Sequence, residues 1–146
     1  MQPPLDFPNQ WTLRSELRFH SIFADTRHPR LLLLLRSKEA VVGADGAETL
    51  LNELADALSA LGDLSQLVVI NDTRGVRPND DPSFERIAAE GFTRLLRPFG
   101  KAIIVVGTQT GALHIHRLTR RFGIELDVFV DPREALLVGQ QTLETP

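Results

Sequence analysis

The most regular pattern along the chain is a leucine repeat at three- and four-residue spacing between residues 43 and 63. A helix brings residues at this spacing onto one side, so the repeat predicts an amphipathic helix over 43–63. The side that it buries carries Leu50, Leu51, Leu54, Leu58 and Leu61. Gly62 directly follows the last of these leucines, and a glycine at this place is typical of a helix end.

Three further segments show a helical pattern. An apolar stripe runs through 81–100, where Asp81 is a candidate N-cap and Pro82 suits the first turn. A second stripe runs through 110–123, and a short last helix is predicted over 131–139. The chain is therefore expected to contain four helices.

Five strands are predicted around these helices. Residues 16–24 alternate between apolar and polar, which is the mark of a half-buried strand. The leucine-rich segment 30–38 follows after a short turn, which favours an antiparallel hairpin. The runs 66–70 and 101–107 are short, apolar and rich in β-branched residues, as central strands are, and 124–130 alternates again.

The predicted order is ββαβαβαβα. Helices between strands imply parallel pairing through crossovers, so we expect an α/β fold with one open mixed sheet, an antiparallel hairpin first and parallel strands after it. A chain of 146 residues is the usual size of one domain. We expect residues 1–12 to form a flexible proline-rich arm, 13–139 the domain and 140–146 a loose tail.

Composition narrows the function classes. The chain has no cysteine, which excludes disulfides, thiolate nucleophiles and cysteine-based zinc sites. A net charge of -3 gives no reason to expect nucleic acid or an anionic membrane as partner. The longest apolar run, 31–35, is far too short for a membrane span, and the N-terminus has no secretory signal pattern. These features predict a cytoplasmic protein, and no cofactor is expected.

Three segments carry a family resemblance: "VVINDTRG" at 68–75, "IIVVG" at 103–107 and "DVFVDPREAL" at 127–136. In this order and spacing they resemble the STAS domain (sulfate transporter and anti-sigma-factor antagonist), and more narrowly the stage II sporulation protein AA-like proteins. The resemblance covers roughly residues 16–138. It implies a non-enzymatic regulatory module that binds a protein partner or itself.

The resemblance also implies a phosphorylation site. In the anti-sigma-factor antagonists a partner kinase phosphorylates a serine at the start of the helix after the third strand. The matching helix here starts at "DDPSFE", 80–85, so Ser83 is the corresponding hydroxyl. The pattern differs from the family's, because the loop is longer, no Ser-Gly follows, and Ser83 lies between Pro82 and Phe84.

The densest polar cluster follows the strand at 66–70. It consists of Asp72, Arg74, Arg77, Asp80 and Asp81. The carboxyl ends of strands are where open α/β sheets bind ligands, and carboxylates there can hold a metal or act as acid and base. The same residue types also form ordinary turns and helix caps, which is the favoured interpretation.

A second polar turn, at 105–112, contains Thr108, Thr110 and Gly111. Free amides and the positive end of a helix dipole can bind a phosphate or a carboxylate there, although a plain threonine N-cap is the favoured alternative. Both polar turns follow parallel strands and should share one edge of the sheet. A small anion would bind between them, gripped by Arg74 or Arg77.

No catalytic or metal-binding constellation is predicted. The chain has no GxSxG signature, and His114 and His116 lie two apart on a helix, where they read as part of a solvated basic face or, less favourably, a docking surface for an acidic partner. His20 and His28 have no assignable partner. Phe84 and Phe92 are assigned to core packing, with a pocket for an acyl chain as the weaker alternative.

Two functions therefore stand ahead of an enzyme. The first is the STAS-like regulatory or protein-interaction module, with phosphorylation of Ser83 left open. The second is a small-ligand binder, for an anion or an apolar, lipid-like molecule, that uses the edge formed by 72–77 and 108–111. A flat, closed edge would favour the first, and a deep cleft with converging polar groups would favour the second.

Overall fold

The computed structural model describes residues 11–37, 39–74 and 82–144. Its six-stranded sheet has the strands side by side in chain order. The first three pair antiparallel and are β1 (Trp11–Glu16), β2 (His20–Asp25) and β3 (Leu31–Arg36). The others extend the sheet in parallel and are β4 (Val68–Asp72), β5 (Lys101–Val105) and β6 (Asp127–Phe129). The prediction of an α/β fold with one mixed sheet is confirmed.

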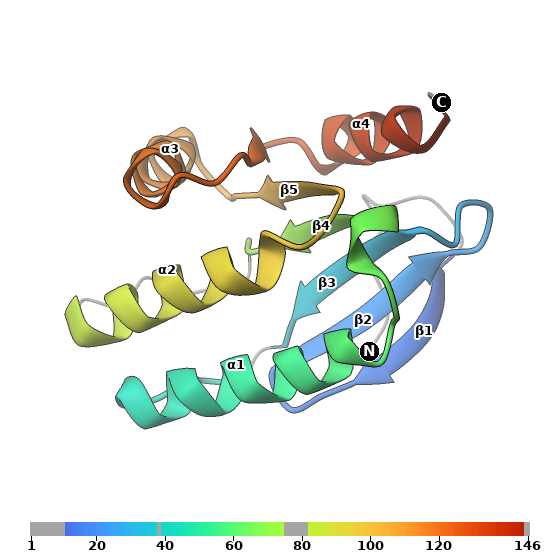
Figure 1. Cartoon of the computed structure of the whole chain (residues 1–146). Helices are drawn as coiled ribbons and strands as arrows, with labels where there is room; N and C mark the ends of the chain where they lie inside the picture. The colour runs from blue at the N-terminus through green and yellow to red at the C-terminus, as the bar shows by residue number, and fades with distance from the viewer. Residues whose placement is uncertain (1–10, 38, 75–81, 145–146) are drawn as a thin grey trace.

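Four helices pack around the sheet in three different positions (Figure 1). They are α1 (Gly43–Ser59), α2 (Pro82–Leu96), α3 (Gln109–Phe122) and α4 (Pro132–Glu144), with a short 3-10 turn at Leu64–Gln66. Helices α1 and α2 lie side by side on one face of the sheet, and α4 lies on the other. Helix α3 contacts β6 and α2 and lies beyond the end of β5.

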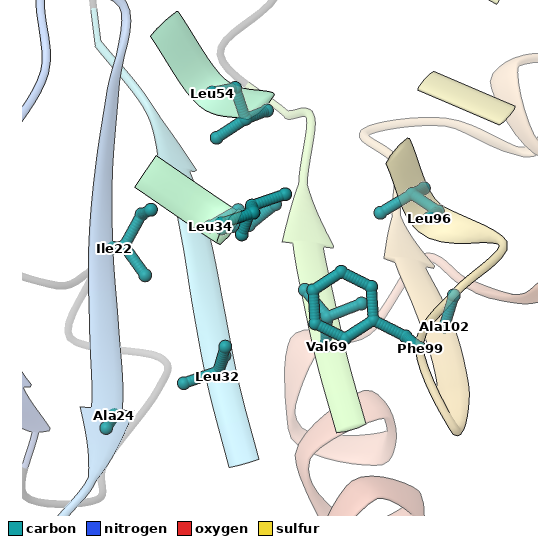
Figure 2. Packing of buried hydrophobic residues seen from close by; sticks show 10 residues of the cluster. Ile22, Ala24, Leu32, Leu34, Leu54, Val69, Leu96, Phe99 and Ala102 are labelled. Carbon is teal, nitrogen blue, oxygen red and sulfur yellow. The ribbon is translucent and has the colours of Figure 1, made fainter. Parts of the chain in front are cut away.

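The alternation of side chains along β4 divides the core into two layers. Val69 packs toward α1 and α2, in a cluster with side chains that include Ile22, Leu34, Leu54 and Leu96 (Figure 2). Its neighbours Val68 and Ile70 point the other way and pack with Ala135 and Leu136 of α4. A strand buried on both faces explains why this segment is continuously apolar in the sequence.

The N-terminal boundary differs from the prediction. Trp11 and Thr12 belong to β1, although 1–12 was expected to be an arm; residues 1–10 lie outside the described part of the chain. The predicted strand 16–24 is in fact the end of β1, a turn and most of β2, with the amide of Leu17 donating to the carbonyl of His20 at 2.7 Å. β1 is an edge strand with mostly exposed side chains, so its sequence lacks the apolar alternation that marks a half-buried strand.

The C-terminal boundary also differs, because α4 continues to Glu144 and includes most of the predicted loose tail. Gly139 is the last residue of the predicted helix 131–139. In the structure it is buried in the helix interior, where an added Cβ would lie 2.9 Å from Leu31 Cδ1. The glycine allows α4 to lie close to the sheet, and Leu143 beyond it packs on the same core.

Replacing Val69 with aspartate tests the central position of β4. Val69 is fully buried, so the new carboxylate would lose its hydration without a partner and cost several kcal/mol, a large part of a domain's stability. We expect a strongly lowered melting temperature, measured by circular dichroism. Leu113→Asp is the matched control, because Leu113 is 60% exposed, and it should melt close to the wild type. Equal melting of Val69→Asp and wild type would contradict the placement of β4.

Candidate functional site

A cavity of about 550 Å³ lies at the carboxyl edge of the parallel strands, enclosed by the sheet, α1, α2 and α3. Most of its wall is apolar. The larger apolar side chains come from all three helices and from β5: Leu50, Leu51, Phe92, Ile104, Ile115 and Leu118. The edge is therefore not flat, as the first of the two predicted functions would have it.

The helices leave this space for a local reason. At Gly91 of α2 an added Cβ would collide with the side chain of Leu51, so the glycine lets α2 lie tightly against α1. Two of the α2 residues that line the cavity are Ala88 and Ala89, whose short side chains leave volume unfilled. Helix α3 contacts β6 rather than the centre of the sheet, and the space over the ends of β4 and β5 therefore stays open.

Three polar residues stand on adjacent strands at the sheet side of this cavity: His20 of β2, Arg36 of β3 and Asn71 of β4. We call them the polar floor. His20 and Arg36 are direct cross-strand partners. Asn71 follows Val69 at the period of two and so shares its face of the sheet, toward α1 and α2. His20 and Arg36 thus lie directly opposite each other, and Asn71, which pairs with Leu34, lies diagonal to Arg36 on the same face of the sheet.

His20 is held in the neutral state. Its side chain is only 2% exposed, and its ring centroid lies 6.1 Å from that of Phe92. Burial lowers the pKa of His20 to about 4, and the nearby charge of Arg36 acts in the same direction. A neutral imidazole offers one donor and one acceptor. No hydrogen bond joins either ring nitrogen to another described residue, and neither nitrogen is a fully buried atom without a partner.

Arg36 is half-buried and only partly satisfied. Its Nη1 donates to the carbonyls of Phe19, Ser37 and Glu39 at 3.3, 3.1 and 3.1 Å. The guanidinium also lies 5.4 Å from the centroid of the Phe19 ring, a cation–π arrangement. Burial lowers the pKa of Arg36, and Glu39 opposes that shift. Nε and Nη2 have no acceptor among the described residues.

Asn71 is 3% exposed and carries the most buried carboxamide at the cavity. Its main chain pairs with β3 and β5. The side chain has no hydrogen-bond partner in the part of the chain that the structure describes. No fully buried side-chain nitrogen or oxygen among the described residues lacks a partner, so the carboxamide of Asn71 keeps some surface open to the cavity. The polar floor therefore presents donors and acceptors to a cavity whose wall is mostly apolar.

The predicted residues Asp72 and Arg74 both line the cavity and are paired with each other. Arg74 Nε and Nη2 donate to the two carboxylate oxygens of Asp72 at 3.0 and 2.8 Å. The Asp72 carboxylate also accepts from the Arg74 amide at 3.1 Å, which is the turn geometry of the favoured interpretation. The charge of Arg74 is thus neutralised by Asp72. Arg77, Asp80 and Asp81 lie outside the described residues.

The second predicted turn acts mainly as a helix cap. Thr108 is the N-cap of α3, and its side-chain oxygen accepts the amide of Gly111 at 3.0 Å. Both residues line the cavity, but this bond already uses the Gly111 amide. Thr110 and Ser83 are exposed and are not part of the cavity wall. His114 lines the cavity from α3, whereas the neighbouring His116 does not.

The polar floor was missed in the sequence, although a weak signal exists. Arg36 and Asn71 each follow directly on a run of buried apolar residues, at the point where a strand approaches its carboxyl end. In a sequence, a polar residue after such a run looks like the start of a loop.

Two other properties concern the described residues as a whole: none of their helices is long and apolar enough to span a membrane, and they contain no cluster of three or more candidate metal ligands.

Protonation of His20 should destabilise the fold at acidic pH. The folded pKa of about 4 lies below the ordinary value of 6.5, so the unfolded state binds more protons between these values. The contribution of the neutral imidazole is therefore complete above pH 6.5 and is lost as the pH falls toward 4. Linkage predicts a loss of about 2 kcal/mol between pH 7 and pH 5, to be measured by denaturant unfolding.

His20→Gln should remove this part of the pH dependence, whatever its effect on stability at pH 7. His116→Gln is the control, since His116 is exposed on α3, and it should keep the wild-type loss. An identical loss for wild type and His20→Gln would show that His20 is not buried in the neutral form.

Comparisons of the chain with protein-family models, with curated proteins and with solved structures found no match. The resemblance to the STAS domain stays a prediction from the sequence, and the function is argued from the cavity itself.

Proposed function

We propose that this protein is a small-molecule-binding module whose ligand is largely apolar and occupies the cavity between the sheet, α1, α2 and α3. The observation that carries the proposal is the cavity itself. Its volume of about 550 Å³ falls within the usual size of ligand sites, roughly 300–1,000 Å³. Its position at the carboxyl ends of parallel strands is where open α/β sheets bind ligands.

The composition of the wall supports a ligand rather than a packing defect. Ligand sites combine apolar walls with a few convergent polar groups, and here the apolar helices face a polar floor of three residues. A cavity that only reflected loose packing would have no need of a histidine, an arginine and an asparagine on the same face of three neighbouring strands. Each of these residues costs desolvation free energy, which a ligand that pairs with them would offset.

The hydroxyl groups at the cavity support binding rather than catalysis. Thr73, Thr93 and Thr119 all line it, and the hydroxyl of each donates to a backbone carbonyl at 2.8 Å. A nucleophilic hydroxyl would instead donate to a base such as His20. We therefore propose a non-enzymatic binder, the second of the two functions that the sequence suggested.

The regulatory module implied by the STAS resemblance, including phosphorylation of Ser83, remains a prediction beside this proposal. The two are compatible, because a binding module can report its ligand to a partner. Among the described residues no feature singles out a protein partner, whereas the cavity singles out a ligand site. For this reason the ligand-binding function is placed first.

Filling the cavity tests the proposal. Ala88→Phe adds an aromatic ring to the wall of α2 and should displace any ligand while leaving the fold intact. The uncharged fluorescent probe N-phenyl-1-naphthylamine should bind the wild type saturably, with enhanced emission. We expect its affinity to fall at least tenfold in Ala88→Phe.

Ala60→Phe is the matched control, because Ala60 is exposed at the C-cap of α1 and the same ring would then project into solvent. This variant should bind the probe like the wild type. Native mass spectrometry of the purified wild type would show in addition whether a ligand copurifies. Absence of probe binding to the wild type, or equal binding by Ala88→Phe, would overturn the proposed function.

A further inference from the structure

Resting on the proposed function, we infer that the ligand is an apolar-chain monocarboxylate whose carboxylate is gripped by Nε and Nη2 of Arg36 on the polar floor. The chain of the ligand would fill the space between α1, α2 and α3. The simplest molecule of this class is a medium-chain fatty acid. The inference depends on the donors that Arg36 leaves unused, on the charges around the cavity and on the neutral partners beside it.

The fork of Arg36 is oriented for a carboxylate. Its Nη1 is held by three backbone carbonyls, which fix the plane of the guanidinium. The stacking against Phe19 supports the same orientation. The Nε–Nη2 side has no acceptor among the described residues, and two parallel donors at this spacing match the two oxygens of a carboxylate.

The charges near Arg36 favour a ligand with one negative charge. No carboxylate in the described part of the chain forms a salt bridge with Arg36, and the carboxylate of Glu39 is engaged by Arg18 at 2.8 Å. Asp72 and Arg74 neutralise each other at the other side of the cavity. Apart from the histidines, the described residues that line the cavity thus carry one positive charge, on Arg36, that no carboxylate of the cavity neutralises.

The neighbours of Arg36 suit a monoanion better than a dianion. His20 stays neutral at physiological pH because its pKa is about 4, so it adds a hydrogen bond but no second positive charge. Asn71 offers a carboxamide donor from the next strand. A phosphate dianion would keep an uncompensated negative charge in this half-apolar setting, whereas a carboxylate would not.

The apolar wall favours an apolar body for the part of the ligand beyond its carboxylate. Leu50, Leu51, Phe92, Ile115 and Leu118 surround the space over the polar floor. A polar body would be desolvated there without partners, while an alkyl chain would gain from burial. The combination of one forked cation and an apolar chamber therefore specifies an amphipathic acid.

The test compares decanoic acid with 1-decanol, an uncharged molecule of the same chain length, by calorimetric titration at pH 7.5 below the micelle-forming concentration. The wild type should bind decanoate at least tenfold more tightly than decanol. Arg36→Gln should lower the affinity for decanoate at least tenfold and that for decanol less than threefold. The difference arises because only the carboxylate uses the fork.

Arg117→Gln is the matched control. Arg117 is exposed on α3 and does not line the cavity, so this variant should bind both molecules like the wild type. Arg36→Lys and Asn71→Leu keep the test decisive if Arg36→Gln does not fold. The first keeps the charge without the fork, the second removes the carboxamide, and each should weaken decanoate binding more than decanol binding.

The outcomes separate the inference from the function on which it rests. Equal binding of decanoate and decanol, equal binding of decanoate by wild type and Arg36→Gln, or tighter binding of decyl phosphate than of decanoate would overturn the carboxylate assignment alone. Binding of N-phenyl-1-naphthylamine without binding of either decyl compound would do the same. If the uncharged probe does not bind either, the ligand-binding function itself fails.

Discussion

The parallel pairing of β3, β4 and β5 is the constraint on which the site depends. It brings the carboxyl ends of three buried strands to one edge of the sheet, so that residues distant in the chain become neighbours. Along each strand the side chains alternate between the face covered by α4 and the face covered by α1 and α2. A polar residue at the end of a strand therefore has only two possible environments, and Arg36 and Asn71 both fall on the side of the cavity.

The two faces of the sheet are covered differently, and this asymmetry creates the cavity. On one face α4 lies across β3 to β6, and Gly139 lets it approach the sheet closely. On the other face Gly91 allows α2 to pack closely against α1, where a larger side chain would collide with Leu51. The region over the ends of β4 and β5 is then bounded by three helices but filled by none of them.

The charges at this edge have two distinct roles. Asp72 and Arg74 form a buried ion pair that also closes the turn after β4, and a pair that is satisfied internally has little left for a ligand. Arg36 is tied to the backbone through Nη1 alone, and its Nε and Nη2 have no acceptor among the described residues. The sequence predicted an anion held by Arg74 or Arg77 and by the amides of the second turn; in the structure Arg74 is paired with Asp72, and the Gly111 amide is used by the cap of α3.

Periodicity in the sequence determined the helices, the buried strands and the α/β class, because each of these depends on local spacing of apolar residues. The carboxyl edge could also be predicted, since it follows from strand order alone. Tertiary structure alone decided the rest. β1 is recognisable only through its pairing with β2, and Gly139 only through its contact with Leu31. His20 lies opposite Arg36, and Asn71 lies diagonal to Arg36, because strand register sets these positions, and register is a property of pairing between segments that no local pattern contains.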